Sequence, residues 1–300
     1  MRLSLPRQLS IFAKTYDLQS VSLAAEALGL TQSAASKSLI ALENQLGTRL
    51  LARSPRGTLP TPAGKVLRTR VRFIERELEL AADEMMSELN MNGSKIAIGA
   101  GPSWAAKLLP PMITELHREY PLVQIELVSG SGDYLVPYLE EGVLDIYFGL
   151  PPDSAQFTNY TILDGASIDV AIYARGSHPI FQDDGPLLDN VHRYPWMGFA
   201  HHIELHRRIA DYCERTNRPY RPFEMQIMSL LALMSIARET DHIAFATDIL
   251  EEEMTSRGFK RIAPEEKIYS FESSVAVRTS MLDLAPIKKL IELAKSRLAK

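Results

Sequence analysis

Residues 20–46, SVSLAAEALGLTQSAASKSLIALENQL, decide the fold of the N-terminal part of the chain. The stretch predicts two short helices joined by a tight turn. The first helix has one apolar face, made of Ala24, Ala25 and Leu28. Gly29 follows and can take the positive φ that ends a helix, and Thr31 offers a side-chain oxygen that caps the next one.

The second of these helices has an apolar back and a polar front. The back is a stripe at spacings of four, three and four residues: Ala35, Leu39, Leu42 and Leu46. The front, which faces away from this stripe, consists of Gln32, Ser33, Ser36 and Lys37. This pattern is typical of a helix-turn-helix, which inserts such a helix into the major groove of DNA.

Both flanks of this stretch extend the pattern. Residues 5–16 carry apolar side chains at helical spacing and predict a first helix that packs across the other two. Residues 48–64, TRLLARSPRGTLPTPAG, predict a short hairpin or wing, because three turn residues punctuate it: Pro55, Gly57 and Pro60. Arg53 and Arg56 flank the tip of the hairpin, where they can reach phosphates beside the groove.

A long helix is predicted next, with Thr61 as its N-cap and Pro62 as its first residue, continuing to about residue 89. Its apolar residues form a heptad seam: Leu67, Val71, Ile74, Leu78, Ala81 and Met85. The seam can pack on its own domain or on a second copy of the chain. We expect dimerisation, because a helix that leaves the wing as a linker has little else to bury the seam.

The remainder of the chain predicts an α/β fold. Residues 90–94, NMNGS, interrupt all periodicity and mark a domain boundary. Strands and helices then alternate, which favours a mostly parallel sheet. The expected strands are residues 95–100, 123–128, 144–149, 168–174, 243–246 and 273–277. The expected helices are residues 104–119, 134–141, 204–216, 229–237 and 284–298.

Charge and composition narrow the range of possible functions. Residues 1–65 hold eight basic and three acidic residues, a net charge of +5, which leaves −9 for the rest of the 300-residue chain. A basic first domain on an acidic body favours a polyanionic partner for that domain over a chance fluctuation. No apolar run approaches the roughly 20 residues that span a bilayer, and residues 1–10 lack a signal-peptide core. Cys213 is the single cysteine, so we expect a cytoplasmic protein without disulfides.

Candidate ligand residues lie where the strands end. Open α/β sheets bind ligands at the carboxyl ends of their strands. Ser103 and Trp104 follow the first strand at a helix N-terminus, whose free N–H groups suit an anion such as a carboxylate. Ser129 and Ser131 follow the second strand in SGSG, a stretch that could equally be an ordinary strand-to-helix turn.

Catalytic and metal sites are not predicted. His202 and His206 lie four residues apart, as zinc ligands can, but no carboxylate or cysteine completes a set. We therefore expect a surface or helix-start role for these histidines, although His202 could meet a carboxylate of a ligand. Asp145 and Asp169 lie in strands and are expected to be structural. Signatures of serine hydrolases, Walker loops and dinucleotide sites are missing, so no enzyme activity, cofactor or metal is expected.

Residues 24–64 resemble the LysR-type transcriptional regulators. The matching positions are Ala24, Ala25, Leu28, Gln32, Ser36, Lys37, Leu39, Leu42, Glu43, Leu46 and Gly47, followed in the wing by Arg49, Leu50, Arg53 and residues 61–64. Further on, LDIYFG (144–149) and VAIYARGSHPI (170–180) match in architecture. Ala35 and Ser33 depart from the family, which often has Val and Pro there, and Ser33 can alter base preference.

The resemblance implies three parts: a winged helix-turn-helix (1–61), a dimerising linker helix (62–89) and an effector-binding module like a periplasmic binding protein (94–300). Its first subdomain would comprise about 94–166 and 272–300, and its second about 167–271. The family's cleft also draws on positions that match Phe199, His202, Gln226 and Thr247. The partners implied are double-stranded DNA, a small-molecule co-inducer, further copies of the chain in dimers and tetramers, and RNA polymerase.

Roles can be assigned within the DNA-binding part. Gln32, Ser33 and Ser36 are candidates for reading bases, since Gln can pair bidentately with adenine. The phosphate candidates are Lys37, Arg53 and Arg56. Arg49 is expected to make a structural pair with Glu43. The competing class is an α/β enzyme or solute-binding protein with an accessory N-terminal domain, and the missing catalytic signature and signal peptide count against it.

Overall fold

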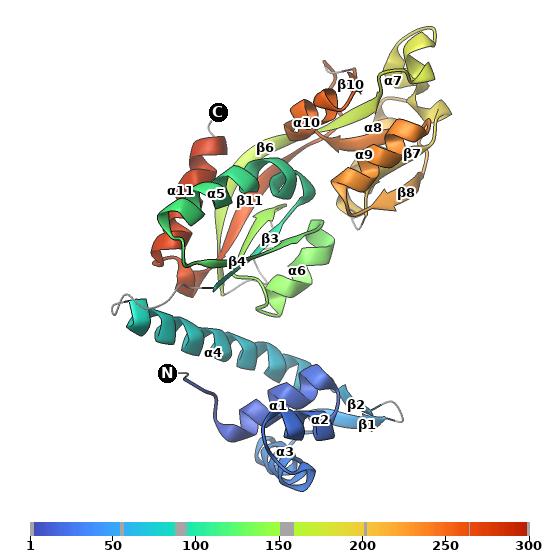
Figure 1. Cartoon of the computed structure of the whole chain (residues 1–300). Coiled ribbons are helices and arrows are strands. Elements are labelled where there is room, and N and C mark those ends of the chain that lie inside the picture. Colours follow the sequence, from blue (N-terminus) through green and yellow to red (C-terminus); the bar gives the residue numbers. More distant parts are fainter. Residues whose placement is uncertain are drawn as a thin grey trace. The chain divides into compact units, whose positions relative to one another are not determined.

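The computed structural model describes residues 3–54, 57–87, 95–150, 159–200, 203–263 and 265–298 (Figure 1). The chain forms two compact units. The first, the N-terminal unit, is Met1–Ser94 together with Glu140–Val143; the second, the C-terminal module, is Lys95–Leu139 and Leu144–Lys300.

Three helices open the N-terminal unit: α1 (Arg7–Leu18), α2 (Val21–Ala27) and α3 (Gln32–Leu46). The predicted helix ends are confirmed. Gly29 has a φ of 65° and Gly47 a φ of 67°, the left-handed conformation that glycine adopts most readily. The Thr31 hydroxyl oxygen accepts a hydrogen bond of 3.2 Å from the Ala34 N–H, so Thr31 caps α3 as expected.

The core of this unit lies where the three helices meet. It is built from α1, α2 and the back of α3: Ile11, Phe12, Ala25, Ala35, Leu39 and Leu42. The predicted apolar face of α2 and the predicted stripe of α3 are each correct except at the last residue, because Leu28 is 37% exposed and Leu46 is 47% exposed. Each lies at the C-terminal end of its helix, beyond the part of the helix that the core covers.

The wing is the antiparallel pair β1 (Leu51–Ser54) and β2 (Gly57–Pro60). Glu43 ties it to α3, because one carboxylate oxygen accepts hydrogen bonds from the Leu50 N–H (2.8 Å) and the Leu51 N–H (3.2 Å). The other oxygen accepts from the Arg49 guanidinium at 2.7 Å, which confirms the predicted Glu43–Arg49 pair. The position of the wing is therefore set by a carboxylate that is itself buried.

Helix α4 (Pro62–Ser87) begins at the predicted cap, where the Thr61 hydroxyl accepts from the Gly64 N–H at 3.0 Å. Its seam divides between two environments. Val71 is fully buried in the core of its own unit, and Leu67 and Leu78 pack against that core. Further along the helix, Ile74 is 45% and Met85 is 54% exposed, so these two remain available to a partner.

The first half of the C-terminal module contains three parallel strands, β3 (Lys95–Ala100), β4 (Gln124–Ser129) and β5 (Ile146–Gly149), with β3 in the centre. Its helices are η1 (Trp104–Leu108), α5 (Leu109–Glu119), α6 (Gly132–Glu140) and α11 (Ala285–Leu298). Helices α5 and α11 lie together on one face of these strands, and α6 lies on the other (Figure 1).

The second half repeats the parallel arrangement, with β7 (Trp196–Phe199) between β8 (Phe223–Ile227) and β9 (Ile243–Thr247). Its helices are η3 (Pro179–Gln182), α7 (Leu187–Asn190), η4 (Val191–Arg193), α8 (Ile203–Arg215), α9 (Leu230–Glu239), η5 (Asp248–Leu250) and α10 (Glu251–Ser256). The sequence pattern did not predict β7, β8 or the short strand β10 (Phe259–Ile262), which pairs with β6.

Two long strands, β6 (Tyr160–Arg175) and β11 (Ser270–Arg278), run through both halves. They pair with each other antiparallel, and β5 and β9 pair antiparallel with them. The strand order is β4-β3-β5-β11-β6-β9-β7-β8. The prediction of a mostly parallel sheet is therefore wrong at its centre, because one strand carries the chain into the second half and the other returns it through η6 (Thr279–Met281) to α11.

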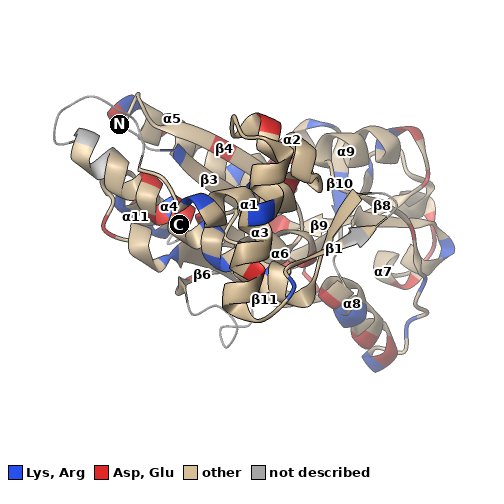
Figure 2. Ribbon diagram, turned by 90° about the horizontal axis from the view of Figure 1, so that it is seen from below, with Lys and Arg blue, Asp and Glu red and all other residues tan. Residues whose placement is uncertain are grey.

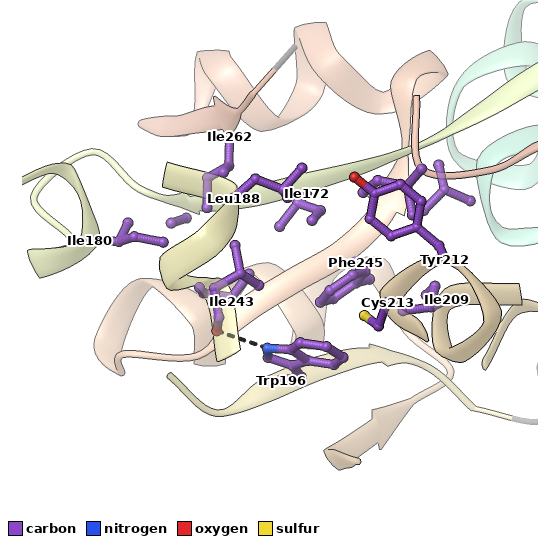
Figure 3. Packing of buried hydrophobic residues seen from close by; sticks show 14 of the residues in the cluster. Ile172, Ile180, Leu188, Trp196, Ile209, Tyr212, Cys213, Ile243, Phe245 and Ile262 are labelled. Atoms are coloured by element: carbon purple, nitrogen blue, oxygen red, sulfur yellow. Dashed lines mark hydrogen bonds between the residues drawn. The ribbon is translucent and has the colours of Figure 1, made fainter. Parts of the chain in front are cut away.

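Aromatic and aliphatic side chains fill the core of the second half (Figure 3). Trp196 packs against Phe245 with ring centres 4.9 Å apart, and its indole N–H donates to the Val191 carbonyl at 2.9 Å. Cys213 belongs to this core, and burial raises the pKa of its thiol. The cysteine therefore stays protonated and acts as a small apolar side chain.

Both aspartates expected to be structural are structural. Asp145 is 2% exposed, pairs with the buried Arg278 guanidinium at 3.2 Å and accepts from the Ala97 N–H at 3.0 Å. Asp169 accepts from the Ser270 hydroxyl at 2.5 Å and pairs with Lys267 at 2.9 Å. These contacts fasten strands of the sheet to one another and to the loop before β11.

Candidate functional site

The polar front of α3 is the first candidate site. Gln32, Ser33 and Lys37 are exposed, and Ser36 is half-buried beside them. The cap at Thr31 fixes where the helix starts, and the buried stripe fixes its rotation. Side chains in the first turns of a helix are those that reach base edges when the helix enters a major groove. The structure therefore brings Gln32, Ser33, Ser36 and Lys37 onto one solvent-facing surface.

A groove separates α3 from the wing. It is lined by Ser36 and Ile40 of the helix and by Ala52 and Thr58 of the wing, and encloses about 1000 Å³, part of it open to solvent. Arg53 pairs with Thr58 across the hairpin. Arg56 lies outside the described residues, so its predicted phosphate contact stays a prediction. Figure 2 marks the lysines and arginines along the helices.

The second candidate site is a cavity between the two halves of the C-terminal module. Its empty volume is about 500 Å³, part of it open to solvent. Segments from both halves line it: Gly101, Pro102, Ser103, Trp104, Ser131, Gly132, Tyr147, Gly149, Leu150, Ile168, Phe199, Leu205, Ala246, Thr247 and Phe271. None of these described lining residues carries a charged side chain. The cavity is therefore apolar with a few hydroxyl groups, which is the usual character of a small-molecule site.

Ser103 and Thr247, two of the predicted residues, line this cavity and bond to each other. The Ser103 and Thr247 hydroxyl oxygens lie 2.6 Å apart and form a hydrogen bond between the two halves. Trp104 forms a wall of the cavity, with its indole N–H donating to the Ser273 hydroxyl at 2.7 Å. Its ring packs on Phe148 with centres 4.9 Å apart, so the tryptophan is both a core residue and a lining residue.

The other predicted ligand residues divide into two groups. Ser131 and Phe199 are buried and line the cavity with Ser103, Trp104 and Thr247. Ser129 and Gln226 are exposed and do not line it. Each of these two lies in a strand, β4 or β8, where neighbouring side chains point to opposite faces. The remaining candidate, His202, lies outside the described residues.

His206 lies in the first turn of α8, which agrees with the helix-start alternative of the prediction, and its side chain is half-buried. Its ring stacks on Phe223 with centres 4.3 Å apart. Burial lowers the pKa of His206, and the nearby Asp133 carboxylate opposes this effect. Within the described ranges, no group of three or more His, Cys, Asp and Glu residues could hold a metal ion. The histidine is therefore a neutral packing residue of α8.

Further contacts join the two halves beside the cavity. The Asp133 carboxylate, in the first turn of α6, accepts from the Ile203 N–H at the start of α8 at 2.9 Å. Lys107 of η1 pairs with Glu253 of α10 at 2.8 Å and also with Glu252. These polar contacts add to the connection that strands β6 and β11 make between the halves, and each would change if the halves moved apart.

Tyr147 lines the cavity and was missed from the sequence. It lies in the middle of β5, in IYFG, and an aromatic residue inside a buried strand normally predicts only core packing. The signal that could have found it is the pair of small residues nearby, Gly149 and Gly132. Both leave room beside the tyrosine hydroxyl, which a larger residue would occupy.

None of the described helices has both the length and the apolar character that a membrane-crossing helix needs.

A winged helix-turn-helix joined to a two-part α/β ligand module defines a class of bacterial regulatory proteins, and comparison with known proteins agrees. Residues 6–65 match the family "Bacterial regulatory helix-turn-helix protein, lysR family", and residues 90–299 match "LysR substrate binding domain". The chain belongs to the LysR family.

Named relatives match part of the chain. The chain is 30% identical over 181 residues to the HTH-type transcriptional regulator GbpR of Azospirillum brasilense, covering 60% of this chain and 53% of the relative. It is 35% identical over 141 residues to the nitrogen assimilation regulatory protein nac of Klebsiella aerogenes, covering 47% and 46%. The chain spans about half the length of these two relatives.

Solved structures share the fold. ArgP from Mycobacterium tuberculosis superposes with a TM-score of 0.74 at 17% identity, over 99% of this chain and 98% of that one. Full-length CbnR in complex with its target DNA superposes with a TM-score of 0.66 at 16% identity, over 97% and 98%.

Proposed function

We propose that this chain is a bacterial transcription factor that binds double-stranded DNA as a dimer and responds to a small-molecule co-inducer. The observation that carries the proposal is the exposed polar front of α3, held in place by a buried stripe and a capped first turn, on a domain with a net charge of +5. The protein acts in the cytoplasm by binding and not by catalysis.

Two kinds of DNA contact follow from the side chains. Gln32, Ser33 and Ser36 read base edges in the major groove, and Thr31 caps the helix that carries them. Lys37, Arg53 and Arg56 neutralise phosphates, which sets affinity and salt dependence and not sequence.

Dimerisation uses the part of α4 that its own unit does not cover. Ile74, Ala81 and Met85 form this part of the seam, and the first and last of them are about half exposed. Val71 contributes to the fold of the unit, while Leu67 and Leu78 lie at the border between the two roles. A second recognition helix then reaches a half-site about one helical turn, or a multiple of it, from the first.

The C-terminal module is the switch. A co-inducer bound among Ser103, Trp104, Ser131, Phe199 and Thr247 contacts both halves, so it stabilises one arrangement of the halves over another. Ser129 and Gln226 would join the site only in a different arrangement of the cleft, and a contact from His202 stays a prediction. Assembly of two dimers into a tetramer, and contact with RNA polymerase, would carry the change to transcription.

The test of DNA binding starts with duplexes selected by the purified protein from a random-sequence pool. Fluorescence anisotropy at several salt concentrations should give a linear fall of log affinity with log salt concentration. Absence of any complex at low salt would refute the proposal.

The split into base readers and phosphate contacts is tested by three variants. Gln32→Ala should weaken binding to the selected duplex more than to a random one. Arg53→Ala should weaken both and reduce the salt slope by about one. Gln45→Ala is the matched control, because Gln45 is exposed near the far end of the same helix, and it should leave binding unchanged.

The dimer is tested by Ile74→Glu, with sedimentation equilibrium as the readout. Val66→Glu is the matched control, because Val66 is 65% exposed on α4 but lies off the seam. The charged residue should dissociate the dimer at position 74 and not at position 66. Equal masses for both variants would show that the seam does not form the interface.

A further inference from the structure

Tyr147 carries a buried hydroxyl group that the described protein does not use. The residue is fully buried, and no described residue accepts the proton of its hydroxyl, although the Leu150 backbone N–H lies near its oxygen. Burial raises the pKa of Tyr147, the nearby Leu150 backbone N–H opposes this, and the Asp133 carboxylate adds to it. The phenol therefore keeps its proton, and a backbone N–H beside it, being a donor, cannot accept that proton.

Two glycines leave the space that this hydroxyl occupies. A Cβ atom at Gly149 would lie 2.2 Å from the tyrosine oxygen, so no larger residue fits there without displacing it. A Cβ at Gly132 would lie 3.4 Å from the same oxygen, which places the hydroxyl beside the first residue of α6. Both glycines line the cavity together with Tyr147. The chain thus keeps space around a polar atom.

A second unused hydroxyl belongs to Ser131, which also lines the cavity and directly precedes Gly132, the glycine beside the Tyr147 oxygen. Ser131 is 2% exposed, and its hydroxyl oxygen also has no partner within the described ranges. Its carbonyl accepts from the Tyr134 and Leu135 N–H groups, so Ser131 is the residue at which α6 starts. The first N–H groups of a helix have no acceptor inside the helix. Donors from α6, Ser131 and Tyr147 therefore converge on one region.

The two unpaired hydroxyls determine which kind of chemical group could form hydrogen bonds with them. A buried hydroxyl without a partner is costly, and phenylalanine would fill the same space at position 147 without that cost. The missing partner must accept hydrogen bonds, because all the converging groups can donate. Among the described residues that line the cavity, none has a charged side chain that could provide this acceptor.

We propose that the Tyr147 and Ser131 hydroxyls are the ligand-reading pair of the cavity, and that they donate to an sp² oxygen of the co-inducer, in a carboxylate or a neutral carbonyl group. The inference rests on the proposed co-inducer site and adds its recognition chemistry. Tyr147 is then the residue that determines specificity, because its hydroxyl discriminates ligands with the oxygen from those without it.

The first test needs no ligand. Tyr147→Phe removes a hydroxyl that has no partner, so the melting temperature of the free protein should stay the same or rise. Tyr160→Phe is the matched control, because Tyr160 is also buried but its hydroxyl donates to the Leu144 carbonyl at 2.5 Å. That variant should melt at a lower temperature. An equal loss in both variants would overturn the proposal, since the Tyr147 hydroxyl would then have a partner in the free protein.

The second test uses a thermal-shift titration of the full chain with acetate, propionate, pyruvate and benzoate, and with the amides of the same acids. At least one probe should stabilise the wild type, and Tyr147→Phe and Ser131→Ala should each weaken its binding at least tenfold. Ser129→Ala, an exposed change in the same SGSG stretch, should not. Stabilisation by acids alone identifies a carboxylate, and stabilisation by the amides as well identifies a carbonyl.

Two results would overturn the proposed role of the two hydroxyls. One is an unchanged melting temperature with every acid and amide, and the other is an unchanged probe affinity in both variants. Failure of the proposed function has a different signature, because the wild type would then form no complex with DNA in the anisotropy assay. A wild type that binds DNA and a probe, with Tyr147→Phe retaining full probe affinity, refutes only the inference about Tyr147.

Discussion

Replacing Glu43 by alanine should detach the wing from the recognition helix. The Glu43 carboxylate is 7% exposed and accepts three hydrogen bonds, from the Leu50 and Leu51 backbone N–H groups and from Arg49. Its loss leaves the Leu50 N–H buried without an acceptor. Because β1 begins at Leu51, the change acts at the junction between α3 and the wing.

The size of the effect follows from these contacts. An orphaned buried N–H costs about 1–3 kcal/mol, and a hydrogen bond to a charged group contributes a similar amount. The two backbone bonds together should therefore give a loss of about 3 kcal/mol. The Arg49 contact adds little, because that side chain is 75% exposed and surface ion pairs contribute about 0–1 kcal/mol.

Hydrogen exchange of peptides that cover residues 32–60 is the suitable assay. A loss of about 3 kcal/mol corresponds to a rise of roughly 100-fold in the opening equilibrium. Both tryptophans, Trp104 and Trp196, lie in the C-terminal module, so the tryptophan-fluorescence unfolding curve should not change. DNA affinity should fall, because the wing no longer holds its position beside α3.

Arg49→Ala distinguishes the contribution of the ion pair from that of the backbone hydrogen bonds to Glu43. It removes the ion pair but leaves both backbone bonds to Glu43, so exchange should rise by less than about fivefold. If Arg49→Ala and Glu43→Ala had equal effects, the ion pair and not the buried carboxylate would hold the wing. An unchanged exchange rate in Glu43→Ala would refute the argument altogether.

Three other substitutions test separate parts of the fold. Arg278→Leu leaves the Asp145 carboxylate buried without its cation, and should destabilise the C-terminal module by about 3–5 kcal/mol in a urea titration followed by tryptophan fluorescence. Burial lowers the pKa of His206 in the folded protein, so on acidification the unfolded chain takes up a proton at this residue before the folded chain does. The module should therefore lose stability as the pH falls below about 6.5. His206→Gln should make this pH dependence shallower. Gly64→Ala places a Cβ 2.0 Å from the Leu50 carbonyl oxygen, and should destabilise the N-terminal unit by about 1–3 kcal/mol and increase hydrogen exchange there.

Local patterns predicted the N-terminal unit well. Caps and glycines act within a few residues of the chain, so the ends of α2, α3 and α4 could be located at Gly29, Thr31 and Thr61. Errors occurred where burial depends on what lies across from a side chain. Leu28 and Leu46 match the helical period but lie at helix ends outside the core.

The linker helix shows a second limit of prediction from the sequence. A heptad seam indicates that apolar residues share one face, but it does not identify the surface that covers them. The structure places Val71 in the core of its own unit and leaves Ile74 exposed, although both lie on the same predicted seam. Packing on the same chain and pairing with another copy produce the same sequence pattern.

The sequence by itself determined the class of protein, the helix ends at Gly29, Thr31 and Thr61, and two of the hydroxyls that line the cavity, Ser103 and Ser131. These features depend on residue type and on neighbours in the chain. Only the tertiary structure decided that Tyr147 belongs to the cavity while Ser129 and Gln226 do not. The two sides of the cavity come from segments more than 100 residues apart, as in the Ser103–Thr247 hydrogen bond. No local pattern records which of two strand faces meets a partner so distant in the chain.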